Sequence, residues 1–378
     1  MLTRVCVIAC LGLALPSQTV RAEVEEEKPK LALIFGKLWI TPLLGPAYTP
    51  ELGFVIAGGT LLSYRFDDES PRSSAPIALS YSTTGALSFT IKPAMYLLED
   101  ELRVDAYFGA KSMTDNYFGV GYQAGNSTPI GGTTTQYLRD FQQLNGSLLW
   151  RLRPSLYVGG AFDVSRSDAT QLAAQMQQDP TVVAQGTYFR NTGVGPVLRF
   201  DSRDYPSNAF EGIYFQAQYL FYRPGLGGTT NYNIVDLDYR QYKTISRPGV
   251  TLAWNLRTRH GVGEVPWTEL SFLGSGSDLR GYREGRYRDD TMIYGLLEFR
   301  WMDLKGLNPA GEPFFGLNGV VSWVGAGTMG SSYAHLNCLL PNFGVGYRIV
   351  VQGRMAVRLD MGAGRESTGF YFSFNESF

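Results

Sequence analysis

The stretch "GVTLAWNLRTR", residues 249–259, alternates large apolar side chains with small or polar ones. The two faces of such a strand would carry Val250, Leu252, Trp254 and Leu256 on one side and Thr251, Ala253, Asn255 and Arg257 on the other. Successive side chains of a β-strand point to opposite faces, so this period of two predicts a strand with one apolar side. The same alternation returns in "GIYFQAQYLFY" (212–222) and in residues 355–361.

A soluble β-sandwich also alternates, so the number of long strands and the scarcity of helix between them decide the fold class. Fifteen strands are predicted after residue 50, centred near Ile56, Ala78, Phe89, Val104, Leu144, Val158, Val194, Phe215, Val235, Leu252, Leu296, Val320, Val345, Val357 and Phe372. Single-chain bacterial barrels have even strand numbers, and "LALIFGKLWITPLL" (31–44) can supply one more strand. We therefore predict an all-β chain that forms a 16-stranded transmembrane antiparallel β-barrel.

Composition agrees with this fold class. Mean hydropathy is only −0.10, and the chain holds 23 Tyr, 22 Phe and 44 Gly. Low mean hydropathy combined with many aromatic residues is typical of barrels whose inward half is polar. After the amino-terminal segment no run of eighteen apolar residues occurs, which excludes helical membrane spans. The best candidate helix is "ATQLAAQMQQ", residues 169–178, in a polar loop.

The amino terminus has the three-part pattern of a secretory signal peptide. Arg4 precedes an apolar run over residues 5–15, and the segment ends in small residues at Ala22. The run is too short for a membrane anchor, and Cys10 lies too early for a lipoprotein signal. We expect a signal peptide at 1–22, a short periplasmic segment at 23–50 that includes the first strand, and a β-barrel domain at 51–378.

Cysteine and charge content narrow the possible functions. Cleavage after Ala22 would leave Cys338 as the single cysteine, so no intramolecular disulfide is expected. The chain holds 33 Lys and Arg against 34 Asp and Glu, which gives no electrostatic reason to expect nucleic acid as a partner. His260 and His335 are the only histidines, and no catalytic or metal-binding motif surrounds them. The sequence therefore predicts no enzyme, no metal site and no cofactor.

Several motifs resemble those of one family in the family's own order. "FLGSGSDLRGY" (272–282) resembles the sixth-loop motif of the BamA/TamA superfamily, the bacterial surface antigen family, and "DSRDYPSNAFEG" (201–212) resembles its Asp-Thr-Arg-Asp turn. "LLEFRW" (296–301) and "GVGYRIVVQGRMAVRLDMG" (344–362) resemble the strand after the loop and the penultimate hairpin. Together with the terminal Phe378, these matches span about residues 50–378.

The resemblance implies an outer-membrane barrel of a Gram-negative-type bacterium, with outer-membrane lipids and other outer-membrane or periplasmic proteins as partners. The residues that it singles out are Leu279, Arg280, Gly281 and Tyr282 in the loop motif, Asp201, Arg203 and Asp204 in the turn motif, and Phe374 and Phe378 in a barrel-targeting terminus. Members that insert other proteins usually carry periplasmic POTRA modules. Only about 30 residues separate Ala22 from the first confidently placed strand, so the chain resembles the POTRA-less branch.

A loop of residues 274–290 that folds into the lumen would need an acceptor for Arg280, because a guanidinium removed from water without a partner is costly. Alternation in "MIYGLLEFRW" (292–301) places Glu298 inward, which makes it the first expected partner. The family usually supplies a second acid on the next strand, where this chain has Gly325. Asp360 is the expected substitute. The alternative is that Arg280 lies on an exposed loop in contact with water.

Two functions remain open at this point. One is assembly of outer-membrane proteins or lipids through a weak lateral seam between the first and last strands, and the other is a gated conduit with loop 274–290 as a lumen plug. A short or frayed seam favours the first, and complete pairing favours the second.

The terminus "FYFSFNESF" (370–378) would place Phe370, Phe372, Phe374 and Phe378 toward lipid, with Glu376 on the same face.

Overall fold

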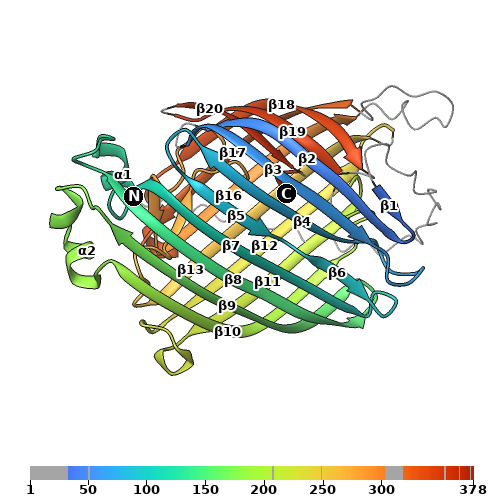
Figure 1. Ribbon diagram of the computed structural model, residues 1–378, viewed down its shortest axis with the longest axis horizontal. Helices are drawn as coiled ribbons and strands as arrows, with labels where there is room; N and C mark the ends of the chain where they lie inside the picture. Colours follow the sequence, from blue (N-terminus) through green and yellow to red (C-terminus); the bar gives the residue numbers. More distant parts are fainter. Residues whose placement is uncertain are drawn as a thin grey trace, which may run out of the picture.

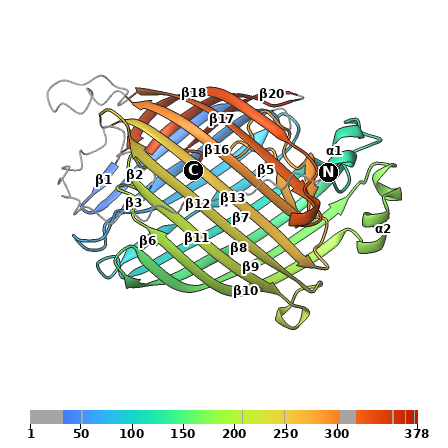
Figure 2. The ribbon, with the colours of Figure 1, turned by 180° about the vertical axis from the view of Figure 1, so that it is seen from behind.

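The computed structural model describes residues 33–49, 52–206, 208–247, 249–302, 318–352, 355–365, 367–374 and 376–378. The expected signal peptide and the leader up to residue 32 lie outside these residues. Figures 1 and 2 show a strongly curved sheet wound into a barrel, with the first strands (blue) beside the last ones (red). The fold is an all-β antiparallel barrel, as the alternation predicted.

The first half of the chain forms β1 (Leu33–Phe35), β2 (Leu38–Thr49), β3 (Gly53–Tyr64), β4 (Ser73–Ser82), β5 (Leu87–Ile91), β6 (Ala94–Leu97), β7 (Leu102–Asn116), β8 (Gln136–Arg153), β9 (Leu156–Thr170) and β10 (Tyr188–Asp201). The second half forms β11 (Gly212–Tyr222), β12 (Tyr232–Thr244), β13 (Val250–Gly263), β14 (Ser271–Leu273), β15 (Tyr287–Asp289), β16 (Thr291–Met302), β17 (Asn318–Gly330), β18 (Leu340–Gln352), β19 (Met355–Ala363) and β20 (Thr368–Phe374).

Each wall strand pairs antiparallel with its neighbour in sequence, from β2–β3 to β19–β20. Segments β5 and β6 both pair with β7, and so form one interrupted strand. Hairpin β14–β15 stands apart as a separate two-stranded sheet. With β1 left aside as a three-residue segment, the described residues form sixteen wall strands. All fifteen predicted centres lie within them, and β2 is the additional strand expected near the amino terminus.

The two faces of the wall differ in polarity. On β16 the outward side chains Leu297 and Phe299 are 43% and 42% exposed, whereas the inward Glu298 and Arg300 are 0% and 1% exposed. The same holds on β13, where Leu256 is 54% exposed and Asn255 is buried. Apolar residues outside and polar residues inside are the arrangement of a transmembrane barrel. None of the helices in the described ranges is long and apolar enough to cross a membrane.

Connections at the two ends of the barrel differ in length. One end carries tight turns such as residues 154–155, and the other carries the long loops 117–135, 171–187 and 264–290. Short turns mark the periplasmic end of outer-membrane barrels and long loops the extracellular end. The long loops hold α1 (Tyr122–Ser127), η1 (Met176–Gln178) and α2 (Pro180–Gln185). The helix predicted over 169–178 is therefore wrong: β9 continues to Thr170, and the α-helix begins only after the cap at Asp179.

Residues 264–270, the first part of the last long loop, pack against the walls at the extracellular end, and we call them the extracellular cap. Trp267 is fully buried and packs edge-on against the rings of Tyr117, Tyr137 and Phe189, which come from three separate parts of the chain. Its indole N–H donates to the carbonyl of Gly186 at 2.9 Å. The first part of loop 264–290 is therefore fastened to the walls and to the loop that holds α2.

Candidate functional site

The loop of residues 274–290 lies inside the barrel. Leu279, Arg280 and Tyr287 are completely buried, and Tyr282 is 2% exposed. The loop leaves the wall through β14, returns through β15, and carries the predicted motif between them. Its tip is packed among residues of the last five strands, from β16 to β20. The alternative of an exposed loop is therefore wrong for Arg280.

Arg280 joins two strands through opposite ends of its guanidinium. Its Nη2 donates to Oε1 of Glu298 on β16 at 2.5 Å, and its Nη1 donates to Oδ2 of Asp360 on β19 at 2.6 Å. All three side chains are 0% exposed. A planar guanidinium can hold two carboxylates at fixed angles, which a lysine ammonium cannot do. The structure thus places Arg280 against both of the partners named from the sequence.

An aromatic platform completes the arginine site. The guanidinium carbon of Arg280 lies 3.5 Å from the ring centroid of Trp323 on β17, a cation–π contact between two buried side chains. The Trp323 indole donates to Oδ1 of Asn342 at 3.0 Å, and the Asn342 amide donates to the backbone carbonyl of Arg280. Asn342, which the sequence did not single out, therefore orients both the ring and the loop.

Gly325 is the position where the family has an acid, and the packing leaves little room there. A Cβ at Gly325 would lie 2.4 Å from Cδ2 of Leu296 and 2.7 Å from the carbonyl oxygen of Gly295. An aspartate would therefore have to displace the neighbouring strand before it could reach Arg280. The second carboxylate comes instead from Asp360 on β19, two strands beyond β17, which carries Trp323.

The carboxylates of this site are shared with further arginines. Glu298 accepts from Arg300 at 2.9 Å through its other oxygen and from the hydroxyl of Ser377 at 2.7 Å. Asp360 accepts from Arg348 at 2.6 Å. Arg348 in turn pairs with Glu376 at 2.7 Å. We call this set the arginine cluster; it comprises Arg280, Glu298, Arg300, Arg348, Asp360 and Glu376.

Backbone contacts fix the loop tip next to the arginine cluster. Gly281 has a φ of 106°, and a Cβ there would lie 2.4 Å from the backbone nitrogen of Gly364, so only glycine fits without strain. Its N–H donates to the Tyr371 hydroxyl at 2.9 Å. The hydroxyl of Tyr282 donates to the Pro341 carbonyl at 2.7 Å and accepts from the Arg365 N–H at 2.9 Å. The loop tip is thus attached to β18, to β20 and to the turn that joins β19 and β20.

The carboxyl-terminal residues do not continue the alternation of β20. Phe370 is 45% exposed and faces outward as predicted, but Phe378 is only 7% exposed and packs near the ring of Tyr242 inside the barrel. Glu376 pairs with Arg348 rather than facing lipid. The lipid-facing assignment of Phe378 and Glu376 is therefore wrong, because the chain leaves the wall after Phe374 and turns inward. The side chain of Phe374 lies outside the described residues.

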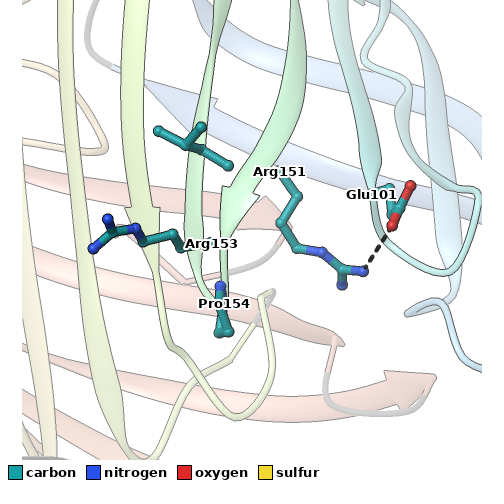
Figure 3. Close-up of a pocket in the computed structure, with 5 residues that line it drawn as sticks. Glu101, Arg151, Arg153 and Pro154 are labelled. Atoms are coloured by element: carbon teal, nitrogen blue, oxygen red, sulfur yellow. Dashed lines mark ion pairs between the residues drawn. The ribbon is translucent and has the colours of Figure 1, made fainter.

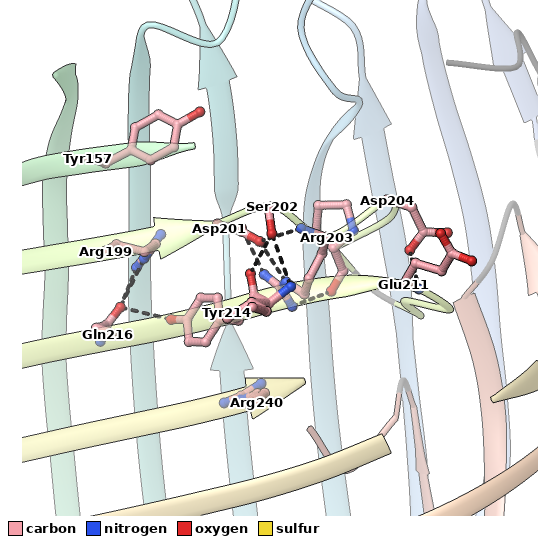
Figure 4. Close-up of polar contacts among 12 residues, drawn as sticks. Tyr157, Arg199, Asp201, Ser202, Arg203, Asp204, Glu211, Tyr214, Gln216 and Arg240 are labelled. Carbon is pink, nitrogen blue, oxygen red and sulfur yellow. Dashed lines mark hydrogen bonds and ion pairs between the residues drawn. The ribbon is translucent and has the colours of Figure 1, made fainter. Parts of the chain in front are cut away.

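The turn motif lies at the periplasmic end, far from the loop along the chain. Asp201 accepts from Arg203 at 2.8 Å (Figure 4). It also accepts from Arg103 on β7 at 2.8 Å. Arg103 also donates to Asp100 at 2.7 Å, and its bond to Asp201 connects β7 with β10 across the lumenal face of β8 and β9. Asp204 accepts from the N–H groups of Phe210 and Glu211, which closes the β10–β11 turn. These residues brace the periplasmic rim.

Glu269 sits in the extracellular cap, and among the described residues no lysine or arginine forms an ion pair with its carboxylate. The oxygen Oε1 accepts from Asn191 at 3.1 Å and from Ser165 at 3.3 Å. Burial, together with the nearby charge of Asp163, raises the pKa of Glu269 to about 7, although Arg259 and Arg139 act in the opposite direction. The neutral acid is therefore the form that the folded cap favours.

This pKa predicts a pH response of the cap. Because the folded pKa lies above the ordinary value of 4.5, the stabilising effect is complete at low pH and is lost as pH rises through about 7. We expect residues 264–270 to exchange amide hydrogens more slowly at pH 5 than at pH 8, after correction for intrinsic rates. Glu269→Gln should remove the difference. An equal pH difference in both proteins would contradict the assignment.

Both histidines lie near the extracellular end. The Nδ1 of His260 is 2.7 Å from Oγ1 of Thr291, and its ring packs against Tyr333. The Nδ1 of His335 is 2.8 Å from the hydroxyl of Ser332 within one exposed turn. A serine triad also needs an acid that orients the histidine, and the described contacts of His335 include none.

One surface pocket lies away from the arginine cluster. It occupies about 480 Å³ at the periplasmic end of β8, where Glu101, Arg151, Leu152, Arg153 and Pro154 line it (Figure 3). Arg151 reaches Glu101 at 3.6 Å. The pocket is open to the surface, so it offers no enclosed site for chemistry.

Comparisons with known proteins agree with this geometry. The model of the Omp85 superfamily domain matches residues 71–328. BamA from Haemophilus ducreyi lacking POTRA domains 1–3 is 11% identical with a TM-score of 0.56, over 89% of this chain and 69% of that one. CdiB from Escherichia coli is 11% identical with a TM-score of 0.59, over 91% and 62%. CdiB from Acinetobacter baumannii is 14% identical with a TM-score of 0.55, over 90% and 60%.

No curated protein sequence matches the chain. At these identities the solved structures show the shared fold, and the chain spans 60 to 69% of their length. The match to the family model establishes family membership, since it covers more than half of the chain. This protein is an outer-membrane β-barrel of a Gram-negative bacterium, and it belongs to the Omp85 superfamily.

Proposed function

We propose that this barrel assembles outer-membrane proteins or lipids by opening sideways between β2 and β20. The observation that carries the proposal is the mismatch of these two strands. β2 is 12 residues long and β20 only seven. A Cβ at Gly45 of β2 would lie 3.0 Å from the ring of Phe372, so the two strands lie side by side at that level. Past Phe374, however, the chain turns into the lumen.

Unequal strands make this seam the weakest line of the wall. Most neighbouring strands elsewhere share longer ladders, such as the pairing of β7 with β8 over residues 102–116. A ladder stabilises a barrel because each backbone group within the bilayer must find a hydrogen-bond partner in the protein. Shortening β20 reduces the number of partners that it can offer to β2. A strand or an acyl chain that entered here would meet the lowest barrier.

The arginine cluster supports the same proposal. Loop 274–290 is bonded to Asp360 on β19 and to Tyr371 on β20, the strands that form one side of the seam. The tail that follows β20 contributes Glu376 and Ser377 to the cluster. Release of the tail and release of the loop are therefore coupled. This coupling suits a gate at the seam.

The test is to join the two strands covalently. In a Cys338→Ala background, Gly45→Cys and Phe372→Cys are bridged with a short bifunctional thiol reagent, and the protein is reconstituted into liposomes. We expect the bridged protein to lose its ability to speed insertion of an urea-unfolded eight-stranded barrel, and to lose exchange of a fluorescent phospholipid between leaflets. Full activity in the bridged protein would contradict the proposal.

A matched pair controls for the chemistry. Leu144 and Val164 face each other on β8 and β9 and are both 44% exposed. The variant Leu144→Cys with Val164→Cys, bridged in the same way, should retain activity because that ladder does not have to open. Loss of activity in both bridged proteins would show that wall flexibility as a whole is needed, and not the seam.

A conduit is the second candidate, and the polar lumen favours it. Asp236, Arg257, Asp238 and Arg240 line the inner face of β12 and β13 as ion pairs. Planar-bilayer conductance separates the two functions. A conduit would keep its conductance after the seam is bridged, and would gain conductance when the loop is released. An assembly factor would lose insertion activity on bridging, whatever its conductance.

A further inference from the structure

The short strand β1 occupies an edge of β2 that belongs to the seam. Residues 38–40 of β2 pair with β3 through Leu62 to Tyr64, and the same three residues pair with β1 as Leu33↔Ile40, Ile34↔Trp39 and Phe35↔Leu38. A strand has only two hydrogen-bonding edges. Because β3 occupies one, β1 must lie on the other, which is the edge that faces β20.

The residues that follow β20 do not lie beside this edge of β2. β20 runs toward the periplasmic end, and its Phe372 lies level with Gly45 of β2. Continued alongside β2, the residues after Phe374 would reach the level of Leu38 to Ile40. They turn inward instead, where Glu376 pairs with Arg348 and Ser377 bonds to Glu298. At the periplasmic mouth of the seam, β1 therefore stands where the end of β20 would otherwise close the wall.

The side chains of β1 fit the lipid face of this position. Leu33 is 59% exposed and Phe35 is 64% exposed, and their cross-strand partners Ile40 and Leu38 belong to the outward face of β2. Paired residues of neighbouring strands share a face. β1 thus continues the apolar outer surface for three residues, as an inserted wall strand would.

The attachment of β1 is slight. Its ladder has three residue pairs, and its turn passes through Gly36 with a φ of 61°. Lys37 in this turn pairs with Asp68 at 3.2 Å, but both side chains are largely exposed, so the pair is screened by water. Arg72 donates to the Lys37 carbonyl at 3.1 Å and stacks on Trp39. The turn is held by the β3–β4 connection, whereas among the described residues the strand itself is held by its three-residue ladder with β2.

We propose that β1 is a placeholder strand, which covers the seam edge of β2 until an extended strand of another polypeptide displaces it. The inference rests on the lateral-seam function proposed above, and it adds that the entry to the seam is covered before a partner arrives. An uncovered edge would present unpaired N–H and C=O groups within the bilayer, and such an edge also pairs with wrong partners. β1 satisfies those groups with too few bonds to resist a longer strand.

The partner follows from the edge. It is a chain that adds antiparallel to β2, as β1 does, with apolar side chains next to Leu38 and Ile40 on the lipid side. Backbone bonds supply most of the affinity in this kind of strand addition, and alternate side chains supply the selectivity. A membrane strand of another outer-membrane barrel has this alternation.

The experiment locks β1 in place. In the Cys338→Ala background, Leu33→Cys and Ile40→Cys form a cross-strand pair that oxidation joins and a reductant opens. The probe is a fluorescent peptide of residues 368–378, "TGFYFSFNESF", which has the required alternation. Binding is measured by anisotropy on protein in nanodiscs, and the site is identified with a photoreactive residue in place of Leu44, the outward residue next to Gly45.

We expect the oxidised lock to weaken peptide binding by about tenfold or more relative to the reduced protein, because apparent affinity falls with the fraction of molecules whose edge is free. Removal of residues 33–35 should strengthen binding by a similar factor. The oxidised Leu144→Cys and Val164→Cys pair should bind as the unmodified protein does.

Three outcomes separate the claims. Weaker binding in the locked form, with cross-linking at position 44, supports the placeholder strand. Equal binding in the locked and reduced forms, with cross-linking at position 44, overturns the placeholder but leaves the seam as the entry. No cross-linking at position 44 in either form overturns the lateral-seam function itself, and the placeholder with it.

Discussion

Arg280→Ala is expected to release loop 274–290 from the lumen wall and to destabilise the loop-bound state by about 3 kcal/mol. The value is at the lower end for a broken buried ion pair because the remaining carboxylates keep partners. Glu298 retains Arg300 and Ser377, and Asp360 retains Arg348. What is lost is the bridge from β16 to β19 and the stacking on Trp323.

Limited proteolysis within residues 283–288, together with single-channel conductance, measures this release. Both should increase in Arg280→Ala. Arg280→Lys should be intermediate, because an ammonium keeps the charge but cannot span two carboxylates and a ring. Glu284→Ala is the matched control, since Glu284 is exposed on the same loop. In a double-mutant cycle with Glu298→Ala, additivity within about 0.5 kcal/mol would contradict a direct interaction.

Leu256→Arg is expected to cost about 2 to 4 kcal/mol of barrel stability, because it puts a charge on the lipid face near the middle of the bilayer. Leu256 is the seventh residue of the 14-residue strand β13, and it is 54% exposed on the outer surface. The barrel should unfold at lower urea concentration in lipid vesicles, as followed by heat-modifiable migration on gels.

Gln218→Arg is the control on the inner face. Gln218 lies directly opposite Asp236 on the neighbouring strand, so an arginine there gains a carboxylate within the polar lumen. The free energy of unfolding should change by less than about 1 kcal/mol, which is the usual contribution of charges that stay in contact with water. Equal destabilisation by the two arginines would contradict the assignment of the inner and outer faces.

Local periodicity explains how much of this molecule could be predicted from its sequence. A period of two places Leu297 outward and Glu298 inward wherever the strand is regular, so the wall strands and the two acids that hold Arg280 could be identified in advance. The motif "LRGY" identified Arg280 itself, the residue that the two acids hold. These features depend on residues that are adjacent in sequence or related by one strand register.

Features outside the strand period could not be predicted in this way. The inward turn after Phe374 ends the alternation, so Glu376 and Phe378 were assigned to the wrong face. Trp267 packs on rings contributed by three distant segments, and Asn342 acts through a single bond to the Arg280 backbone. No sequence period marks such contacts. The hairpin of β1 and β2 divides the stretch 31–44, in which the alternation predicted a single strand, at the two-residue turn of Gly36 and Lys37.

The width of the seam in a bilayer tests the account most directly. Spin labels at Gly45→Cys and Phe372→Cys, in the Cys338→Ala background, report the β2–β20 distance by double electron–electron resonance, and labels at Leu144→Cys and Val164→Cys report a closed ladder. We predict a broad seam distribution that shifts to longer distances when an unfolded barrel protein is added, beside a narrow control that does not change. A seam distribution as narrow as the control, and unchanged by the added protein, would contradict lateral opening.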